Sequence, residues 1–454
     1  MSEALQQAAE LIDAGAYPDA LSALDPVLED NPDDPRALHM MGVVLLESGK
    51  PALAYQLYRR ASELEPDRHQ VWINLGQAAD ELKRYDEAER YFLKALELDS
   101  QNYLALSNLA TIAVHRCEPK SAIKWAKRAL KVQPQAPNAH HNYGFAKLLL
   151  KDYSGWEHYE YGLGRVRWRE EKDYGLPRWD GSPGKSVVVY AEQGIGDQIA
   201  MAGAFNDIKK DCNVALDVAP KLKGLFARSF GVETHGDQFV ESSWAEGRMD
   251  AKCAMSSLQK FYRNTVGSYD GKPYLKADPQ RRLACRALLD SLGDKPKVGI
   301  SWTGGMKETG ASLRSTALEQ LLPILDADVT WVSLEYKDRS EEIAECPVEI
   351  HDFPWLTQTN DYDDTAALVA ELDLVISVPQ SVVHLAGGLG TDCWVMQTHR
   401  PHFLFGLEGE TPLYSSVKQY RRKDTGWAAV ITRIANDLRR RYAVRNSGAR
   451  RAGP

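Results

Sequence analysis

The sequence predicts an α superhelix of two-helix repeats, followed by an α/β region of two Rossmann-like halves with parallel sheets. Three observations lead to this fold class. Residues of the same kind recur every 34 positions through the first third of the 454-residue chain. A stretch rich in Gly and Pro then ends the pattern. Beyond it, short β-branched runs alternate with helical segments, as expected of parallel sheets.

The 34-residue period places small residues where the two helices of a repeat approach closely, and large residues where successive repeats meet. The small residues are Ala20, Ala54, Ala88 and Ala122, and the large ones are Leu24, Tyr58 and Phe92. Proline follows the second helix because it cannot continue a helix. This pattern resembles the tetratricopeptide repeat, and the resemblance implies a protein-binding superhelix.

The domain boundaries are predicted from where this pattern decays. Regular repeats cover residues 1–136, and a degenerate fifth repeat acts as a cap, so the repeat domain spans 1–168. The segment LPRWDGSPGK predicts a linker over 169–185. We expect the first Rossmann-like half at 186–275, and the second at 276–454 with a C-terminal helix and a basic tail.

Composition limits the class of protein. The chain is 44% hydrophobic and 26% charged, which is typical of a globular protein, and its net charge of −8 argues against a nucleic-acid binder. Its six cysteines are scattered without a CxxC pair, which favours a reducing cytoplasm. We find neither a signal-peptide pattern nor an apolar run of about 18 residues, and therefore expect a cytoplasmic protein without a membrane span.

The elements of the α/β region are predicted from its apolar runs. We expect strands at 187–190, 214–218, 297–302, 329–334, 374–378 and 393–397. We expect helices at 198–209, 221–230, 317–325, 364–372, 382–389 and 426–441. Residues 267–296 are polar and helical and separate two βα series, so a cleft should lie between two halves. Ligands of such folds bind at the carboxyl ends of the strands.

The first chemical motif, EQGIGD, follows the first predicted strand and opens a helix. Gly194 and Gly196 let the backbone turn sharply and approach a ligand, and a helix N-terminus favours anions. A purely structural turn, with Asp197 as the helix cap, explains the same pattern.

The second motif, SWTGG, repeats this arrangement at the start of the second half with Ser301, Thr303 and Gly304. Arg314 follows the glycine-rich loop, where an arginine suits phosphate neutralisation. A surface salt bridge is the other interpretation of Arg314.

The third motif, in residues 373–390, joins a strand to a helix that begins with Gln380, Ser381 and His384. Ser381 and His384 are three residues apart and therefore share a helix face. A helix N-terminus with these side chains can hold a diphosphate. A single histidine also serves structural roles in many proteins.

These motifs, in this order and spacing, resemble bacterial glycosyltransferases related to ADP-heptose:lipopolysaccharide heptosyltransferases, which have the GT-B fold. With the repeats, about residues 1–440 resemble bacterial tetratricopeptide-repeat glycosyltransferase-like proteins, some of which modify flagellins or other proteins. The resemblance implies that Asp197 is the catalytic base toward the acceptor. The donor site that we predict comprises Gly194, Gly196, Ser301, Thr303, Gly304, Arg314, Gln380, Ser381 and His384.

One departure from the heptosyltransferase pattern affects which donor can be predicted. Pro379-Gln380 stands where heptosyltransferases usually have Asp-Thr, so ADP-heptose is not assumed. A non-catalytic repeat scaffold with a degenerate glycosyltransferase domain stays an alternative. Transfer to a glycan or lipid-linked saccharide is another.

The metal requirement is predicted from the acidic motifs. No DxD-type motif is placed to hold a metal, and Asp363-Asp364 fits a helix cap. We predict an inverting hexosyl or heptosyl transfer from a nucleotide sugar, without a metal or cofactor.

Three asparagines recur at one position of the first helix of a repeat: Asn74, Asn108 and Asn142. An amide both donates and accepts hydrogen bonds, so such a row can hold an extended peptide, as a similar row does in O-GlcNAc transferase. Asparagine is also common at this position in such repeats generally. We predict that a protein or peptide acceptor binds the concave repeat surface, and we leave the oligomeric state open.

Overall fold

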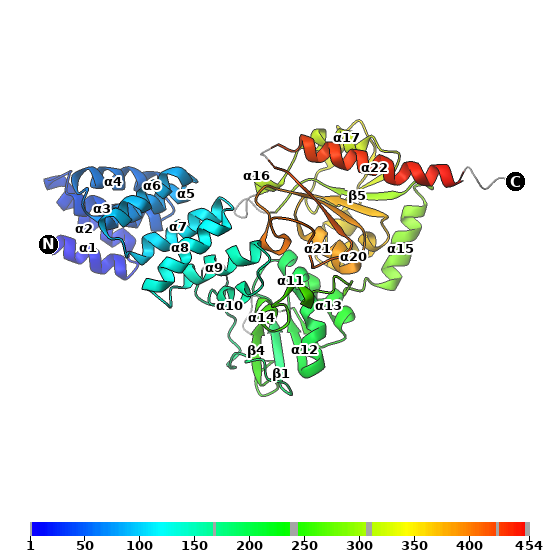
Figure 1. Ribbon diagram of the computed structural model, residues 1–454, viewed down its shortest axis with the longest axis horizontal. Helices are drawn as coiled ribbons and strands as arrows, with labels where there is room; N and C mark the ends of the chain where they lie inside the picture. Colours follow the sequence, from blue (N-terminus) through cyan, green and yellow to red (C-terminus); the bar gives the residue numbers. More distant parts are fainter. Residues whose placement is uncertain (1, 167–168, 237–243, 306–310, 424–425, 450–454) are drawn as a thin grey trace. The chain divides into compact units, whose positions relative to one another are not determined.

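The computed structural model describes the chain except residues 1, 167–168, 237–243, 306–310, 424–425 and 450–454 (Figure 1). Side chains are described up to residue 442, so those of Arg445, Arg450 and Arg451 in the predicted basic tail lie outside the described part. The chain forms two compact units, Met1–Lys147 and Leu148–Pro454. The predicted fold class is confirmed, since repeat helices are followed by an α/β region with two parallel sheets.

The first unit consists of successive helices that pack in pairs. They are α1 (Glu3–Asp13), α2 (Tyr17–Asp30), α3 (Pro35–Glu47), α4 (Pro51–Leu64), α5 (His69–Glu81), α6 (Tyr85–Leu98), α7 (Tyr103–His115), α8 (Pro119–Val132) and α9 (Pro137–Leu149), which ends in the second unit. The four predicted small alanines are fully buried, as are Tyr58 and Phe92. Close packing explains the glycines opposite these rings, because a Cβ on Gly42 would lie 2.6 Å from Tyr58 Cε1.

The second unit begins with α10 (Gly155–Glu160) and a four-stranded parallel sheet of order β3-β2-β1-β4. Its strands are β1 (Ser186–Tyr190), β2 (Asn213–Asp217), β3 (Thr234–His235) and β4 (Ala251–Ala254). The helices of this half are α11 (Ile195–Met201), α12 (Phe205–Asp211), α13 (Lys223–Phe230) and α14 (Leu258–Tyr262). All the strand pairs are parallel, which requires the helical crossovers that the sequence predicts.

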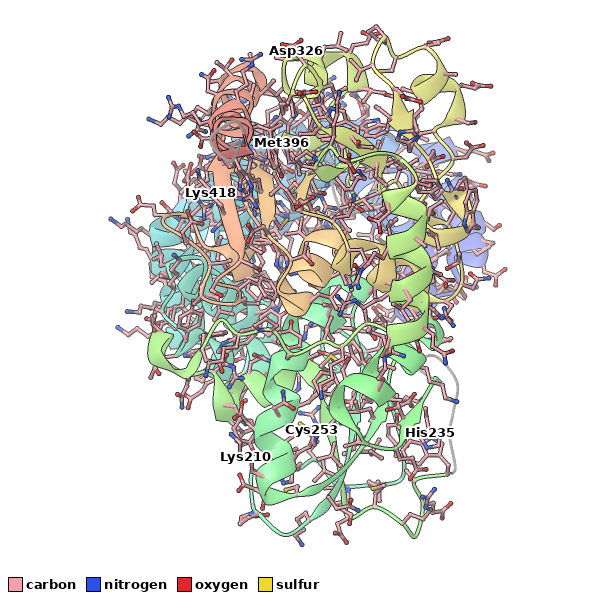
Figure 2. The ribbon with its side chains drawn as sticks, turned by 90° about the vertical axis from the view of Figure 1, so that its right-hand side faces the viewer. Lys210, His235, Cys253, Asp326, Met396 and Lys418 are labelled. Carbon is pink, nitrogen blue, oxygen red and sulfur yellow. The ribbon has the colours of Figure 1, made fainter. Side chains whose placement is uncertain are left out.

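A six-stranded parallel sheet of order β10-β9-β8-β5-β6-β7 forms the second half. Its strands are β5 (Lys297–Ser301), β6 (Thr330–Ser333), β7 (Ile350–His351), β8 (Leu374–Ser377), β9 (Cys393–Gln397) and β10 (Val417–Arg421). The helices are α15 (Pro279–Asp290), α16 (Ala311–Arg314), α17 (Leu322–Leu325), α18 (Ser340–Ala344), α19 (Pro354–Thr357), α20 (Tyr362–Ala370), α21 (Ser381–Leu389) and α22 (Ala428–Ala449). Figure 2 labels Met396 on β9 and Lys418 on β10.

The sequence pattern does not predict four of the strands, β3, β4, β7 and β10, and some predicted helix ends differ from those in the structure. Strand β4 reads AKCA, which lacks β-branched residues, and β3 and β7 have only two residues each. The helix expected at 198–209 is two helices separated by a 3₁₀ turn at Ala202–Ala204, and the first begins at Ile195. None of the six cysteines, all within described ranges, forms a disulfide; Cys253 is buried in β4 (Figure 2).

The segment predicted as a linker, 169–185, has irregular backbone but packs on the first sheet. Trp179 and Tyr174 are buried, and the Trp179 N–H donates to the Lys252 carbonyl at 2.8 Å. A parallel bridge joins Arg178 to Lys252 of β4, so the segment extends the edge of the sheet. The two compact units divide after Lys147, which is before residue 168, where the repeat domain is predicted to end.

The prediction that Asp363-Asp364 caps a helix is wrong. Asp361 caps α20 instead, with its carboxylate accepting from the Asp363 N–H at 3.0 Å. Asp363 is buried and pairs with Arg228 of α13, while Asp364 accepts from Arg281 of α15 at 2.6 Å. Arg228 lies on a helix of the first half and Asp363 on a helix of the second half, so this ion pair links the two halves of the second unit.

Candidate active site

The EQGIGD turn and the start of α21 meet between the two halves of the second unit. Helix α11 follows β1 and α21 follows β8, so both begin at the carboxyl ends of parallel strands. Figure 1 labels the two helices next to each other, and they pack together. A Cβ on Gly196 would lie 3.5 Å from both His384 Cδ2 and Ser381 Cα. The glycine therefore allows the close approach that brings Asp197, Ser381 and His384 to one place.

Asp197 is the acidic group at this meeting point. Its side chain is 31% exposed, and His402 Nε2 lies 3.7 Å from Asp197 Oδ1. Desolvation raises the pKa of Asp197 to about 6, although the Arg314 guanidinium acts to lower it. A carboxyl group with such a pKa is largely ionised at neutral pH and is basic enough to accept a proton.

The environment of the two histidines of the site favours the neutral imidazole. Burial lowers the pKa of His384 to about 3 and that of His402 to about 4. His384 Nδ1 lies 3.1 Å from the Tyr414 hydroxyl, and its ring stacks on Phe405 with 5.2 Å between centroids. In this environment His384 can offer a hydrogen bond to a ligand but no positive charge.

Arg314 supplies the positive charge that the neutral histidines lack. Its charge acts on Asp197, and burial lowers its pKa. The glycine loop approaches it closely, because a Cβ on Gly304 would lie 2.8 Å from Arg314 Cβ. The Gly304 N–H donates to Ser315 Oγ at 3.0 Å, which fixes the loop beside the arginine.

Glu335 organises the glycine loop, and the sequence pattern does not reveal it. This fully buried residue follows β6. Its Oε1 accepts from Ser301 Oγ at 2.7 Å and from the N–H groups of Trp302 and Thr303 at 2.7 and 2.9 Å. The Thr303 hydroxyl donates to the other carboxylate oxygen. An acidic residue directly after a predicted strand is the only sequence signal that points to it.

Protein contacts occupy several side chains of the predicted donor site. Ser301 is fully buried, and its hydroxyl also accepts from Gln380 Nε2. Ser381 Oγ accepts from the Tyr362 hydroxyl at 2.8 Å, whereas Gly194 is exposed where α11 begins. Ser301 therefore positions the glycine loop from within the protein core. Direct contact of these residues with a donor stays a prediction.

A buried ion pair anchors the turn that carries Asp197. Arg169, which comes from the segment after α10, is fully buried, and its Nη2 lies 3.8 Å from Glu192 Oε1. Ser256 bridges the pair, since its hydroxyl accepts from Arg169 at 2.7 Å and donates to Glu192. Arg169 also donates to the Tyr159 carbonyl. The start of the EQGIGD turn is thus fixed to the segment that leads from the repeats.

Two of the three asparagines of the predicted row link neighbouring repeats. Asn74 Nδ2 lies 2.9 Å from His39 Nε2, and Asn142 Nδ2 donates to Thr111 Oγ1 at 2.8 Å. Among the described residues, the buried Asn108 Nδ2 has no hydrogen-bond partner. A groove of about 990 Å³ includes His39, the partner of Asn74, in its wall, but none of the three asparagines lines it. Peptide binding along the row stays a prediction.

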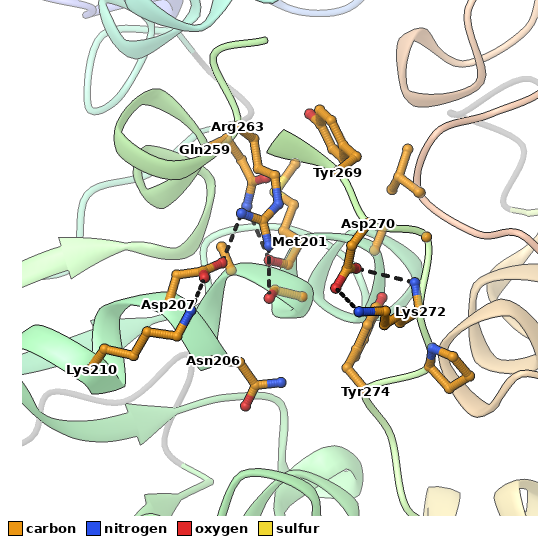
Figure 3. A pocket seen from close by; sticks show the side chains of 16 residues that line it. Met201, Asn206, Asp207, Lys210, Gln259, Arg263, Tyr269, Asp270, Lys272 and Tyr274 are labelled. Atoms are coloured by element: carbon orange, nitrogen blue, oxygen red, sulfur yellow. Dashed lines mark hydrogen bonds and ion pairs between the residues drawn. The ribbon is translucent and has the colours of Figure 1, made fainter. Parts of the chain in front are cut away.

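A small cavity on another side of α11 is a poor candidate for the donor site (Figure 3). Its volume is about 150 Å³, below the roughly 300–1,000 Å³ of typical ligand pockets. Its charged side chains pair with one another, since Asp207 lies 2.8 Å from both Arg263 and Lys210. The meeting point of α11 and α21 is therefore the better candidate.

The part of the chain that the structure describes contains neither a metal-binding cluster nor a membrane-spanning helix. Within it, His, Cys, Asp and Glu side chains form no group of three suited to a metal ion. The same residues include no helix with the length and apolarity needed to cross a bilayer.

The chain is similar to known proteins over two different extents. A tetratricopeptide-repeat family model matches residues 5–67, 39–103 and 73–140. Protein FlbA of Caulobacter vibrioides is 26% identical over 489 residues, covering 94% of this chain and 82% of FlbA. Human protein O-mannosyl-transferase TMTC3 is 34% identical over 121 residues, but these are 26% of this chain and only 13% of TMTC3.

One solved structure is similar to a part of this chain. The Pseudomonas aeruginosa PilF structure is 22% identical, with a TM-score of 0.33, and covers 36% of this chain and 76% of that chain. The first third of this chain consists of tetratricopeptide repeats. The similarity of the whole chain to FlbA extends through both units.

Proposed function

We propose that the second unit is an inverting glycosyltransferase of GT-B type that uses a nucleotide-sugar donor, and that the repeats recruit a protein acceptor. The observation that carries this proposal is the placement of Asp197 beside Arg314, where α11 and α21 begin. A base and a fixed cation at one edge of two parallel sheets suit displacement of a diphosphate. A segment of this chain matches human TMTC3, which is named a protein O-mannosyl-transferase, and this similarity adds support to the proposed sugar transfer.

The proposed reaction is a single displacement. Asp197 accepts the proton of the acceptor hydroxyl while that oxygen forms a bond to the anomeric carbon. The bond from this carbon to the diphosphate oxygen breaks on the opposite face, so the configuration inverts. The nucleoside diphosphate leaves with the bonding electron pair, and Arg314 and the N–H groups at the start of α21 stabilise its negative charge.

The acceptor and the metal requirement are further parts of the proposal. A protein acceptor follows from the repeats, which commonly bind polypeptides. We also propose that no metal takes part, because Arg314 can neutralise the leaving group. A cytoplasmic location fits a nucleotide-sugar donor and unpaired cysteines.

Donor binding tests the proposal directly. We expect one class among UDP, GDP, ADP, CMP and their sugars to raise the melting temperature, since a ligand at about 100 times its Kd stabilises by about 2.7 kcal/mol. Replacing Arg314 by Ala should abolish the shift. Arg440→Ala, at a side chain that is 80% exposed, is the matched control and should keep it. A flat panel for the wild-type protein would favour the non-catalytic scaffold, with Pro379 as the reason.

A further inference from the structure

The first repeat carries charge of one sign only. Residues 1–35 contain nine Asp or Glu and no Lys or Arg. Among the described residues, seven of these acids are exposed and form no ion pair: Glu3, Glu10, Asp13, Asp19, Asp25, Glu29 and Asp30. Helices α1 and α2 thus present an unneutralised acidic surface, which we call the acidic end.

Helix α8 carries charge of the opposite sign. It contains five cations and no acid, and all five are exposed: Lys120, Lys124, Lys127, Arg128 and Lys131. Residues three or four apart share a helix face, so these cations form one stripe. The buried residues of α8 face the other way and are Pro119, Ala122, Ala126 and Ala129. We call the five cations the basic stripe.

No described acid neutralises the basic stripe. Three of its cations lie against aromatic rings instead, and two of these, Lys124 and Arg128, are 5.3 and 5.0 Å from the centre of the Trp125 ring. Lys127 is 5.8 Å from the centre of the Tyr143 ring. Helix α7, which packs against α8, contains no Asp, Glu, Lys or Arg. The stripe is therefore available to an acidic partner.

The two charged surfaces cannot neutralise each other within one molecule. They belong to the same compact unit, in which the elements in close contact are α1 with α2 and α3, and α8 with α7. The second and third repeats separate them. A second copy of the chain can bring them together, because its acidic end complements the basic stripe.

We propose that the acidic end of one molecule docks on the basic stripe of a second, so that the chain associates head to tail. Each copy retains one free surface of each sign after docking. Such an interface extends into open chains unless its rotation closes a ring. This inference concerns the repeat unit alone and does not depend on the proposed glycosyltransferase activity.

Sedimentation velocity of the full chain at two salt concentrations tests the proposal. The screening length falls from about 10 Å at 0.1 M salt to about 3 Å at 1 M. We expect species larger than a dimer to grow with protein concentration at the lower salt and to dissociate at the higher salt. A monomer under both conditions would overturn the proposal.

Charge reversal identifies the surfaces. A variant with K124E, K127E and R128E, and another with E10K, D13K and D25K, should each lose self-association at the lower salt. Mixing the two should restore it, because each then offers the surface that complements the other. Reversal of three exposed cations outside α8, with K50E, R59E and K83E, is the matched control and should leave association unchanged.

The mixture of the two variants distinguishes a specific interface from a general effect of charge. Circular dichroism should show that every variant keeps its helices, because all the substituted side chains are exposed. Association that survives both reversals, or loss that mixing does not restore, would contradict the head-to-tail interface. Dissociation by the control variant would also contradict it, since a nonspecific charge effect would then account for the salt dependence.

Discussion

Replacement of Asp197 by Asn should lower the rate of sugar transfer by about 10²–10⁴-fold, which is the usual contribution of a positioned general base. The amide has nearly the same size as the carboxylate, but it cannot accept the acceptor's proton. Donor affinity should change little, since Arg314 and the start of α21 remain. Transfer is measured as release of the nucleoside diphosphate from whichever nucleotide sugar binds.

The pH dependence of the same reaction gives a second readout of Asp197. Its pKa is raised to about 6, so the active carboxylate is lost as pH falls through that value. The rate should therefore rise with pH below about 6 and level off above it. The D197N variant should lose this ionisation from its profile.

An exposed aspartate provides the control for this prediction. Asp290, at the end of α15, is exposed, and its change to Asn should leave both rate and profile unaltered. A wild-type rate in the D197N protein would remove Asp197 as the base. Loss of donor binding in that protein would instead point to an effect on the fold of the site.

Replacement of Arg169 by Met should destabilise the second unit by about 3–5 kcal/mol, the usual cost of removing one partner of a buried ion pair. Arg169 is fully buried, and Glu192 would keep its carboxylate without the compensating charge. Unfolding in denaturant measures the loss. An R169M/E192Q double variant should recover part of it, because no uncompensated charge then stays buried.

The pH dependence of this loss has a definite sign. Burial already raises the pKa of Glu192 in the folded protein, and removal of the arginine raises it further. A group with a raised folded pKa takes up a proton more readily when folded, so low pH favours the folded state. The deficit of R169M should therefore shrink as pH falls and grow as pH rises.

A surface pair supplies the matched control. Arg178 pairs with Glu171, and the arginine side chain is 42% exposed. Its change to Met should cost less than about 1 kcal/mol, as surface ion pairs do. Equal losses for R169M and R178M would contradict the role of burial in the Arg169–Glu192 pair.

Periodic and local features of the fold are predictable from the sequence. The 34-residue period follows from small residues between paired helices, and Ala20 and Ala54 are fully buried as that reasoning requires. The turns at Gly196 and before Ser381 are indicated by local sequence features, namely a glycine and the start of a helix. Both could therefore be placed at strand ends without knowledge of distant contacts.

The remaining parts of the site depend on contacts between distant residues. Glu335 and Arg169 each bond to a loop that lies far away in the sequence, and neither belongs to a local pattern. Asp363 looks like a helix cap because it stands at a helix start, yet its partner Arg228 comes from the other half. Burial and charge pairing, rather than propensity, decide the roles of these three residues.

Mass spectrometry of the reaction products shows directly whether this chain transfers a sugar to protein. The purified chain is incubated with the stabilising nucleotide sugar and a lysate of its own cells, beside D197N. We expect a protein that gains the mass of one hexose or heptose residue with the wild-type chain only. An adduct confined to saccharides would show that the acceptor is a saccharide instead of a protein. Equal products from both chains would contradict sugar transfer that depends on Asp197.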